Sequence, residues 1–251
     1  MSSPYLPPEL LDHTVDFLHD DPRALKECCL VSKSWIPRTR KHLFGHIMFR
    51  TQKSLQSWIE TFPDPLDSPA HHTHTLTYSQ SVECSEAGDW ITSFSRVVYF
   101  DVIGHGLPAT HWPMASFVPF HGISPIIKSI RVDFAILPTS QIFGLILSFP
   151  LLEDLTVVTY FGASTSDGGD GSPVQPSNPP TFTGSLDLYM RGGMDPIARR
   201  LLSSPGGIHF RKLTFTWFQD SDAPLIRGLV WECSRTLESL KITRSTHGTF
   251  V

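Results

Sequence analysis

Apolar residues along most of the chain recur in short apolar–x–apolar triplets, a spacing typical of half-buried β-strands. Eight such triplets begin at residues 47, 76, 98, 130, 155, 186, 213 and 240. The distances between their first residues are 29, 22, 32, 25, 31, 27 and 27 residues. Two copies share a longer Leu-Glu-x-Leu-x-apolar pattern, at 152–157 and 237–242. The pattern therefore predicts a repeated strand unit from residue 46 onward.

Helical patterns separate several of these strands. Apolar residues fall on one face over 54–62 and 140–149, and two further helices are expected to begin at Asp195-Pro196 and at Pro224. One strand and one helix per repeat, with a period similar to that of leucine-rich repeats, predicts an α/β solenoid with a parallel sheet over 46–251. The alternative is an irregular α/β domain whose strands do not stack in chain order.

Two segments depart from the repeat. Residues 162–184 contain five Gly, four Pro and four Ser, so we expect a flexible loop that does not contribute to a core. A binding or phosphorylation role for this loop is the alternative. The last repeat ends in the seven residues 245–251, which show no polar cap, so both a short array and an incomplete chain stay open.

The first 45 residues predict a separate module of three short helices. Pro8 suits the first turn of one helix, and Asp21-Pro22 suits the N-cap and first position of the next. Ser32 can cap a third helix, in which Pro37 is expected to cause a kink or a restart. Aspartates 12, 16 and 20 are expected to face mostly outward on the first helix.

The motifs of this module resemble an F-box, and the whole chain resembles fungal F-box proteins with a degenerate leucine-rich-repeat-like region. The resemblance covers about forty residues and rests on five matches in order and spacing: Leu6-Pro7-Pro8-Glu9-Leu10, Phe17-Leu18, Leu25, Cys29-Leu30-Val31-Ser32-Lys33-Ser34-Trp35 and Leu43-Phe44. Pro37 departs from the family pattern and puts the geometry of the third helix in doubt.

The resemblance implies docking on the adaptor Skp1, which links F-box proteins to a cullin and a RING subunit of an SCF-type ubiquitin ligase. A forty-residue helical module cannot bury all its apolar surface, so a helix-in-groove interface fits this expectation. The residues expected to contact Skp1 are Leu6, Pro7, Glu9, Leu10, Leu25, Leu30, Val31 and Trp35. In the alternative, several of them, above all Leu10 and Leu30, only hold the three helices together.

The repeat region would then bind a target protein, which makes the chain a substrate receptor. Residues between the apolar positions of each strand point away from the core. The expected target-binding residues are Thr77, Tyr99, Arg131, Thr156, Thr214 and Lys241. The alternative function is a non-catalytic scaffold whose F-box-like helices cap the repeats and recruit no ligase. The sequence does not name the target.

Composition and charge disfavour nucleic-acid-binding, membrane-spanning and secreted proteins. The chain has 251 residues, 40% hydrophobic, with a net charge of −4, so no global basic field favours nucleic acid or membrane. No apolar run is long enough to span a bilayer, and no signal peptide is recognisable. Four scattered cysteines without such a signal predict a reducing compartment, the cytoplasm or the nucleus.

Charge is divided within the first module. Residues 1–30 carry six acidic and two basic side chains, whereas 31–53 carry six basic and no acidic ones. We expect the basic helix face to balance the acidic first helix, although a nucleic-acid patch is the alternative.

No pattern in the sequence indicates an enzyme. A phosphate-binding loop, a dinucleotide-binding motif and a nucleophile elbow are all missing from the sequence. The histidines at 71, 72 and 74 have no Cys or acidic partner at metal-binding spacing, so they are interpreted as loop residues. We expect no catalytic residue, no metal and no cofactor.

Overall fold

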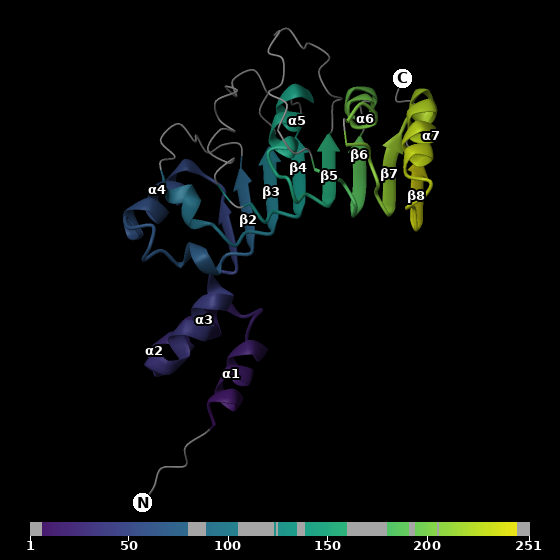
Figure 1. The fold of residues 1–251 in the computed structure, drawn as a ribbon. Helices are drawn as coiled ribbons and strands as arrows, with labels where there is room; N and C mark the ends of the chain where they lie inside the picture. The colour runs from purple at the N-terminus through teal and green to yellow at the C-terminus, as the bar shows by residue number, and fades with distance from the viewer. Residues whose placement is uncertain are drawn as a thin grey trace, which may run out of the picture.

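The computed structural model describes residues 7–79, 89–104, 123, 125–134, 139–159, 180–190, 194–204 and 206–244. Within these ranges the protein is α/β, with seven α-helices and a single sheet of eight parallel strands. The strands lie side by side in chain order, from β1 to β8 (Figure 1). The predicted parallel sheet is confirmed, and the strands stack in the order in which they occur along the chain.

Three N-terminal helices precede the sheet and lie apart from it (Figure 1). They are α1 (Pro8–Phe17), α2 (Pro22–Val31) and α3 (Ile36–Leu43). Asp21 caps α2 as predicted, because its carboxylate accepts hydrogen bonds from the backbone N–H groups of Arg23 and Ala24 at 3.0 and 3.1 Å. Ser32 caps a short 3₁₀ turn, Lys33–Trp35, and α3 then restarts with Pro37 in its first turn. The restart at Pro37 is therefore confirmed.

The sheet and its helices follow as one continuous body. The strands are β1 (His46–Phe49), β2 (Thr75–Ser79), β3 (Tyr99–Gly104), β4 (Ser129–Phe134), β5 (Asp154–Thr159), β6 (Ser185–Met190), β7 (Lys212–Phe218) and β8 (Ser239–Arg244). The helices are α4 (Gln52–Thr61), α5 (Thr139–Leu147), α6 (Asp195–Leu202) and α7 (Ala223–Glu232). Short 3₁₀ turns occur at Pro69–His72, Asp89–Ser93 and Asp220–Asp222.

Two apolar ladders cross the whole sheet because the strands pair without slippage at these positions. The first ladder consists of Ile47, Leu76, Phe100, Ile130, Leu155, Leu186, Leu213 and Leu240. The second consists of Phe49, Tyr78, Val102, Val132, Val157, Leu188, Phe215 and Ile242. From β1 to β7 all members of both ladders are buried, and they form one core with residues of α4 to α7.

The opposite face of the sheet carries the alternate residues of each strand, most of which are polar. The helices cover one face, so this second face, named here the open face, presents its side chains away from the core. A single sheet with one covered face therefore presents a broad polar surface on its other side.

Two sequence expectations need correction. The third triplet is displaced by two residues, because Phe100 and Val102 join the apolar ladders and Tyr99 lies at the start of β3. Within the expected loop 162–184, residues 162–179 lie outside the described part, but Phe182 is buried and its ring lies 5.4 Å from that of Phe210. An aromatic ring at the end of a Pro- and Gly-rich stretch thus belongs to the core.

Candidate functional site

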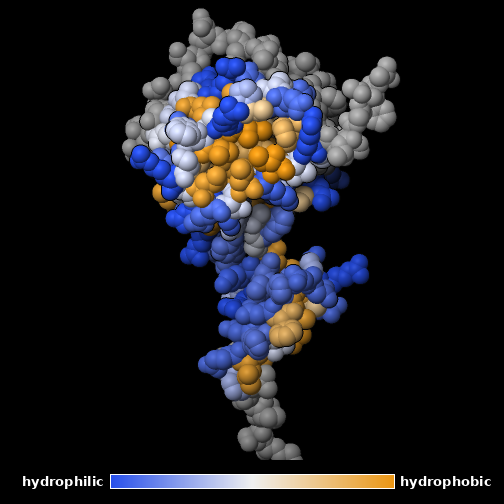
Figure 2. Space-filling view, turned by 90° about the vertical axis from the view of Figure 1, so that its right-hand side faces the viewer, coloured by the Kyte–Doolittle hydropathy of each residue, from blue (hydrophilic) through white to orange (hydrophobic). Residues whose placement is uncertain are grey.

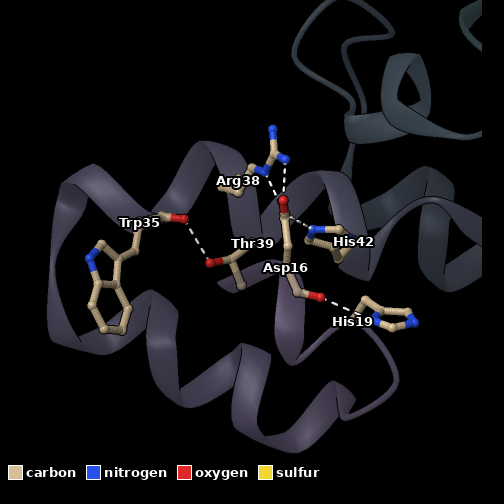
Figure 3. Close-up of polar contacts among 6 residues, drawn as sticks. All are labelled: Asp16, His19, Trp35, Arg38, Thr39 and His42. Carbon is tan, nitrogen blue, oxygen red and sulfur yellow. Dashed lines mark hydrogen bonds and ion pairs between the residues drawn. The ribbon is translucent and has the colours of Figure 1, made fainter. Parts of the chain in front are cut away.

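A small buried centre holds the three N-terminal helices together. Val15, Leu25 and Cys28 are buried between them, and burial raises the pKa of the Cys28 thiol. Thr39 is also buried, and its hydroxyl donates to the carbonyl of Trp35 at 2.7 Å (Figure 3). A buried polar group needs such a partner. This centre fixes which faces of the helices point inward.

Asp16 joins α1 to α3 through its carboxylate (Figure 3). The Arg38 guanidinium donates to both carboxylate oxygens, and His42 Nε2 lies 2.7 Å from Oδ1. The hydrogen bond from Arg38, and then that involving His42, holds the pKa of Asp16 well below its ordinary value. The expectation that Asp16 faces outward is wrong: it is half-buried and partnered. The balance of acidic and basic helices is confirmed at this pair.

Four large apolar side chains of these helices remain outside the buried centre. Leu10 and Phe17 lie seven residues apart on one face of α1, and the Phe17 side chain is 79% exposed. Leu30 and Val31 lie next to each other at the end of α2, with Leu30 87% exposed. Figure 2 shows apolar surface on the N-terminal helices among hydrophilic residues. An unpaired helix surface of this kind is typical of a docking site for another protein.

The residues expected to contact Skp1 fall into three groups. Pro7, Glu9, Leu10, Leu30 and Val31 are exposed and Trp35 is half-buried, so all six present surface. Leu25 is buried in the helix centre and presents none. Leu6 lies outside the described residues.

In the alternative interpretation, Leu10 and Leu30 above all would pack between the three helices. In the structure both are exposed, and Leu25 is the residue that packs there. Sequence reasoning also missed Phe17 as a surface residue. Its spacing of seven from Leu10 was the available signal.

The open face places five of the six expected target-binding residues in one row. In register across the sheet, the row reads Met48, Thr77, Asp101, Arg131, Thr156, Asp187, Thr214 and Lys241. Tyr99 lies in the neighbouring row, opposite Thr75 and Ser129, and is exposed. Met48, Asp101 and Asp187 belong to the row but were missed. Asp187 lies between two leucines of a predicted triplet, which was the signal for it.

Polar contacts connect the open-face side chains across β1 to β3. His46 Nε2 lies 3.0 Å from Thr77 Oγ1, and this hydroxyl lies 3.5 Å from Asp101 Oδ2. Thr77 was expected to be exposed, but it is only 2% exposed. Burial raises the pKa of Asp101, although the positive charge of Arg131 acts in the opposite direction. Arg131 also lies 3.4 Å from Asp133.

Two hollows adjoin this face. A pocket of about 340 Å³ near the ends of β1 to β3 is lined by Met48, Arg50, Thr77, Ser79 and Ile103. A second hollow of about 610 Å³ lies where β5 to β8 begin and is lined by Glu153, Asp154, Thr183, Gly184, Ser185, Arg211, Lys212 and Glu238. Gly184 is required there because a Cβ atom would lie 2.3 Å from an Asp154 oxygen. The first hollow combines apolar and polar side chains, and the second combines acidic and basic ones. Such mixed linings suit contact with the surface of another protein.

Neither a metal site nor a membrane-spanning helix is found in the described part of the chain. Among the described residues, no group of three or more His, Cys, Asp or Glu side chains is arranged to hold a metal ion. In the same part of the chain, no helix is long and apolar enough to cross a membrane. The histidines at 71 and 72 lie with ring centres 4.0 Å apart, and burial lowers the pKa of His72.

Comparison with known proteins assigns no family to the chain. No protein-family model matches it, and no curated protein sequence matches it either. The F-box resemblance of the first 45 residues therefore stays a prediction from its motifs. The two candidate binding surfaces among the described residues are the exposed apolar side of α1 and α2 and the polar open face of the sheet.

Proposed function

We propose that this chain is the substrate-recognition adaptor of an SCF-type ubiquitin ligase. In this proposal α1 to α3 form an F-box that docks on a Skp1-like adaptor and, through it, on the cullin and RING subunits. The following residues form a leucine-rich-repeat-like α/β solenoid whose open face binds the target protein. The role requires no catalytic residue or cofactor from this chain, and it would be carried out in the cytoplasm or nucleus.

The observation that carries the docking step is the exposed apolar surface of α1 and α2. Leu30 and Val31 are 87% and 68% exposed although α2 has other residues, such as Leu25, that are buried. Contact with a partner would remove this apolar surface from water, which is favourable by about 25 cal/mol per Å². The half-buried Trp35 adds an aromatic side chain of the kind that dominates interface energies.

The alternative is a scaffold whose N-terminal helices only cap the sheet. Some contacts favour it, since the Phe44 ring lies 6.0 Å from that of Trp58 in α4 and the Thr73 hydroxyl donates to the Phe44 carbonyl at 2.9 Å. Both contacts involve Phe44, the residue that follows α3. The exposed residues of α1 and α2 stay unused by them, which is why docking is preferred.

Binding to purified Skp1 tests the docking step. Changing both Leu30→Asp and Val31→Asp should weaken binding by about 30-fold or more, because two interface anchors become desolvated charges. Leu151→Asp is the matched control, since Leu151 is 50% exposed on the sheet body and should leave binding unchanged. The dissociation constant is measured by titration calorimetry, with circular dichroism confirming that each variant is folded.

The outcomes separate the two functions. Equal affinity of the double variant and the wild type would reject the proposed interface. Failure of the folded wild-type chain to bind any Skp1 would leave the scaffold function.

Target binding is tested with a photo-crosslinking residue introduced at single positions. Thr156 lies in the middle of the open-face row, and Arg199 is exposed on α6 on the helix side. Adducts specific to position 156 are expected in cells, because the target would lie against the strand side chains. The same adducts at both positions would contradict a target site on the open face.

A further inference from the structure

The two ends of the sheet differ in how their apolar ladders finish. At β1 the ladder residues Ile47 and Phe49 are buried, and the Trp58 ring of α4 lies 5.9 Å from that of Phe49. At β8 the corresponding residues Leu240 and Ile242 are 44% and 47% exposed. Figure 2 shows an apolar patch ringed by hydrophilic residues on the end of the body that carries β8 and α7. Among the described residues, no helix follows β8 to cover Leu240 and Ile242.

β8 is also an edge strand with free backbone groups. The sheet order places it next to β7 on one side and next to no other described strand. The Ser239 N–H donates to the Arg211 carbonyl at 3.0 Å, toward β7. Backbone groups of successive residues alternate in direction along a strand, so those of Leu240 and Ile242 point to the free edge. An edge of this kind is a template for another strand.

The sequence of this edge is complementary to itself when read in the opposite direction. Residues 238–244 read Glu-Ser-Leu-Lys-Ile-Thr-Arg, with Lys241 at the centre. An antiparallel copy centred on Lys241 would set Glu238 opposite Arg244, Ser239 opposite Thr243, and Leu240 opposite Ile242. Charged, hydroxyl and apolar residues thus each meet a matching class, and such cross-strand pairs stabilise sheets.

From this complementarity we infer that the occupant of the β8 edge is a second copy of this chain. The two β8 strands pair antiparallel about a two-fold axis at Lys241, and Leu240 and Ile242 of each copy exchange backbone hydrogen bonds. Hydrogen-bonded and non-hydrogen-bonded pairs must alternate along an antiparallel ladder. This register meets that requirement, because Leu240 and Ile242 form the hydrogen-bonded pairs and Lys241 forms the non-hydrogen-bonded pair between them. The two exposed ends of the apolar ladders then cover each other.

Alternative registers are less well matched. A two-fold axis at Ile242 would set Leu240 opposite Arg244 and would give Glu238 no basic partner on the second copy, leaving it only Arg211 of its own chain at 3.9 Å. In the register centred on Lys241, the only mismatch is Lys241 against its own copy. Like charges directly opposite each other are destabilising, so the dimer is weak and depends on protein concentration.

The dimer has a consequence for the open faces. A two-fold axis perpendicular to the sheet keeps the open faces of both copies on one side. The row that ends at Lys241 in one copy then continues into the row of the second copy. The inference does not depend on Skp1 binding, so a failure of the adaptor proposal would leave it unaffected.

Sedimentation equilibrium of the full chain from micromolar to sub-millimolar concentration tests the inference. The wild type is expected to shift from monomer toward dimer with concentration, and Ile242→Lys is expected to abolish the shift. Leu151→Lys is the matched control, because Leu151 has a similar exposure of 50% away from β8. Lys241→Thr should raise the association constant by up to about fivefold, whereas Lys212→Thr on β7 should not.

Cysteine crosslinking tests the register. Opposed residues in a non-hydrogen-bonded antiparallel pair have Cα atoms about 4.5 Å apart, within the range for a disulfide. Lys241→Cys should therefore give a disulfide-linked dimer on mild oxidation. Ser239→Cys alone should not, but it should form a mixed dimer with Thr243→Cys. The parent chain, with its native cysteines, gives the background.

Three results would overturn the inference. One is a wild-type chain that stays monomeric over the whole concentration range. Another is association that Ile242→Lys leaves intact. The last is crosslinking of Ser239→Cys as efficient as that of Lys241→Cys.

Discussion

Asp16 is expected from the sequence to face mostly outward on α1, but in the structure its carboxylate is paired with α3. Its carboxylate lies between Arg38 and His42 of α3, which follow it by 22 and 26 residues. A bidentate pair with a guanidinium is among the stronger polar interactions of proteins. The pair joins α1 directly to α3 within the helical module.

Asp16→Asn should lower the melting temperature, since the substitution removes the charge that Arg38 binds. The folded-state pKa of Asp16 is lowered, so its stabilising effect is complete above the unfolded value of about 3.9 and is lost as pH falls further toward the folded value. The difference between the wild type and Asp16→Asn should therefore be constant near neutral pH and shrink below about pH 4. Thermal melts followed by circular dichroism measure it.

Asp12→Asn is the control on the same helix, because Asp12 is exposed. Its melting temperature should stay close to that of the wild type. An equal decrease for both substitutions would mean that the general charge of α1, not the Asp16 pair, stabilises the helices.

At the scale of elements, the strands are stabilised by neighbours on both sides. Leu186 in β6 and Leu240 in β8 are the same residue type in the same apolar ladder. Leu186 is fully buried, whereas Leu240 is 44% exposed at the free edge. Leu186 and Leu240 share the same local strand geometry. A difference in their contribution to the free energy of unfolding therefore measures the effect of the neighbouring repeat.

Leu186→Ala should destabilise the protein by about 2–5 kcal/mol, because it leaves a cavity in the core. Leu240→Ala should cost less than about 1 kcal/mol, as is usual for surface positions. Urea unfolding at low protein concentration, where the chain is monomeric, measures both values. Similar costs for the two substitutions would show that the β8 end is covered in solution even in the monomer.

The helical module shows which features of a helix can be predicted from residues close in sequence. The Asp21 cap and the restart at Pro37 were predictable, because capping and proline effects depend only on residues close in sequence. The eight strands were predictable for a similar reason, since alternation is a local pattern. The third strand was misplaced by two residues because Val98, Tyr99 and Phe100 offered an equally apolar triplet.

At the scale of the whole molecule, the described residues leave three surfaces uncovered: the outer sides of α1 and α2, the open face and the β8 edge. They lie on different parts of the body, as Figures 1 and 2 show. An adaptor needs separate surfaces for its ligase and its target, and a free edge adds the possibility of joining two adaptors. The three proposals can therefore be tested independently of one another.

The sequence by itself determined the strand pattern, the cap of α2 and five members of the open-face row, because these follow from periodicity and from near neighbours. Only the tertiary structure decided that Leu25 is buried while Leu30 is exposed, that Asp16 binds α3, and that Asp101 takes the place expected for Tyr99. The physical reason is that burial, ion pairing and register depend on which distant segment lies opposite, and one strand or helix does not specify its partner.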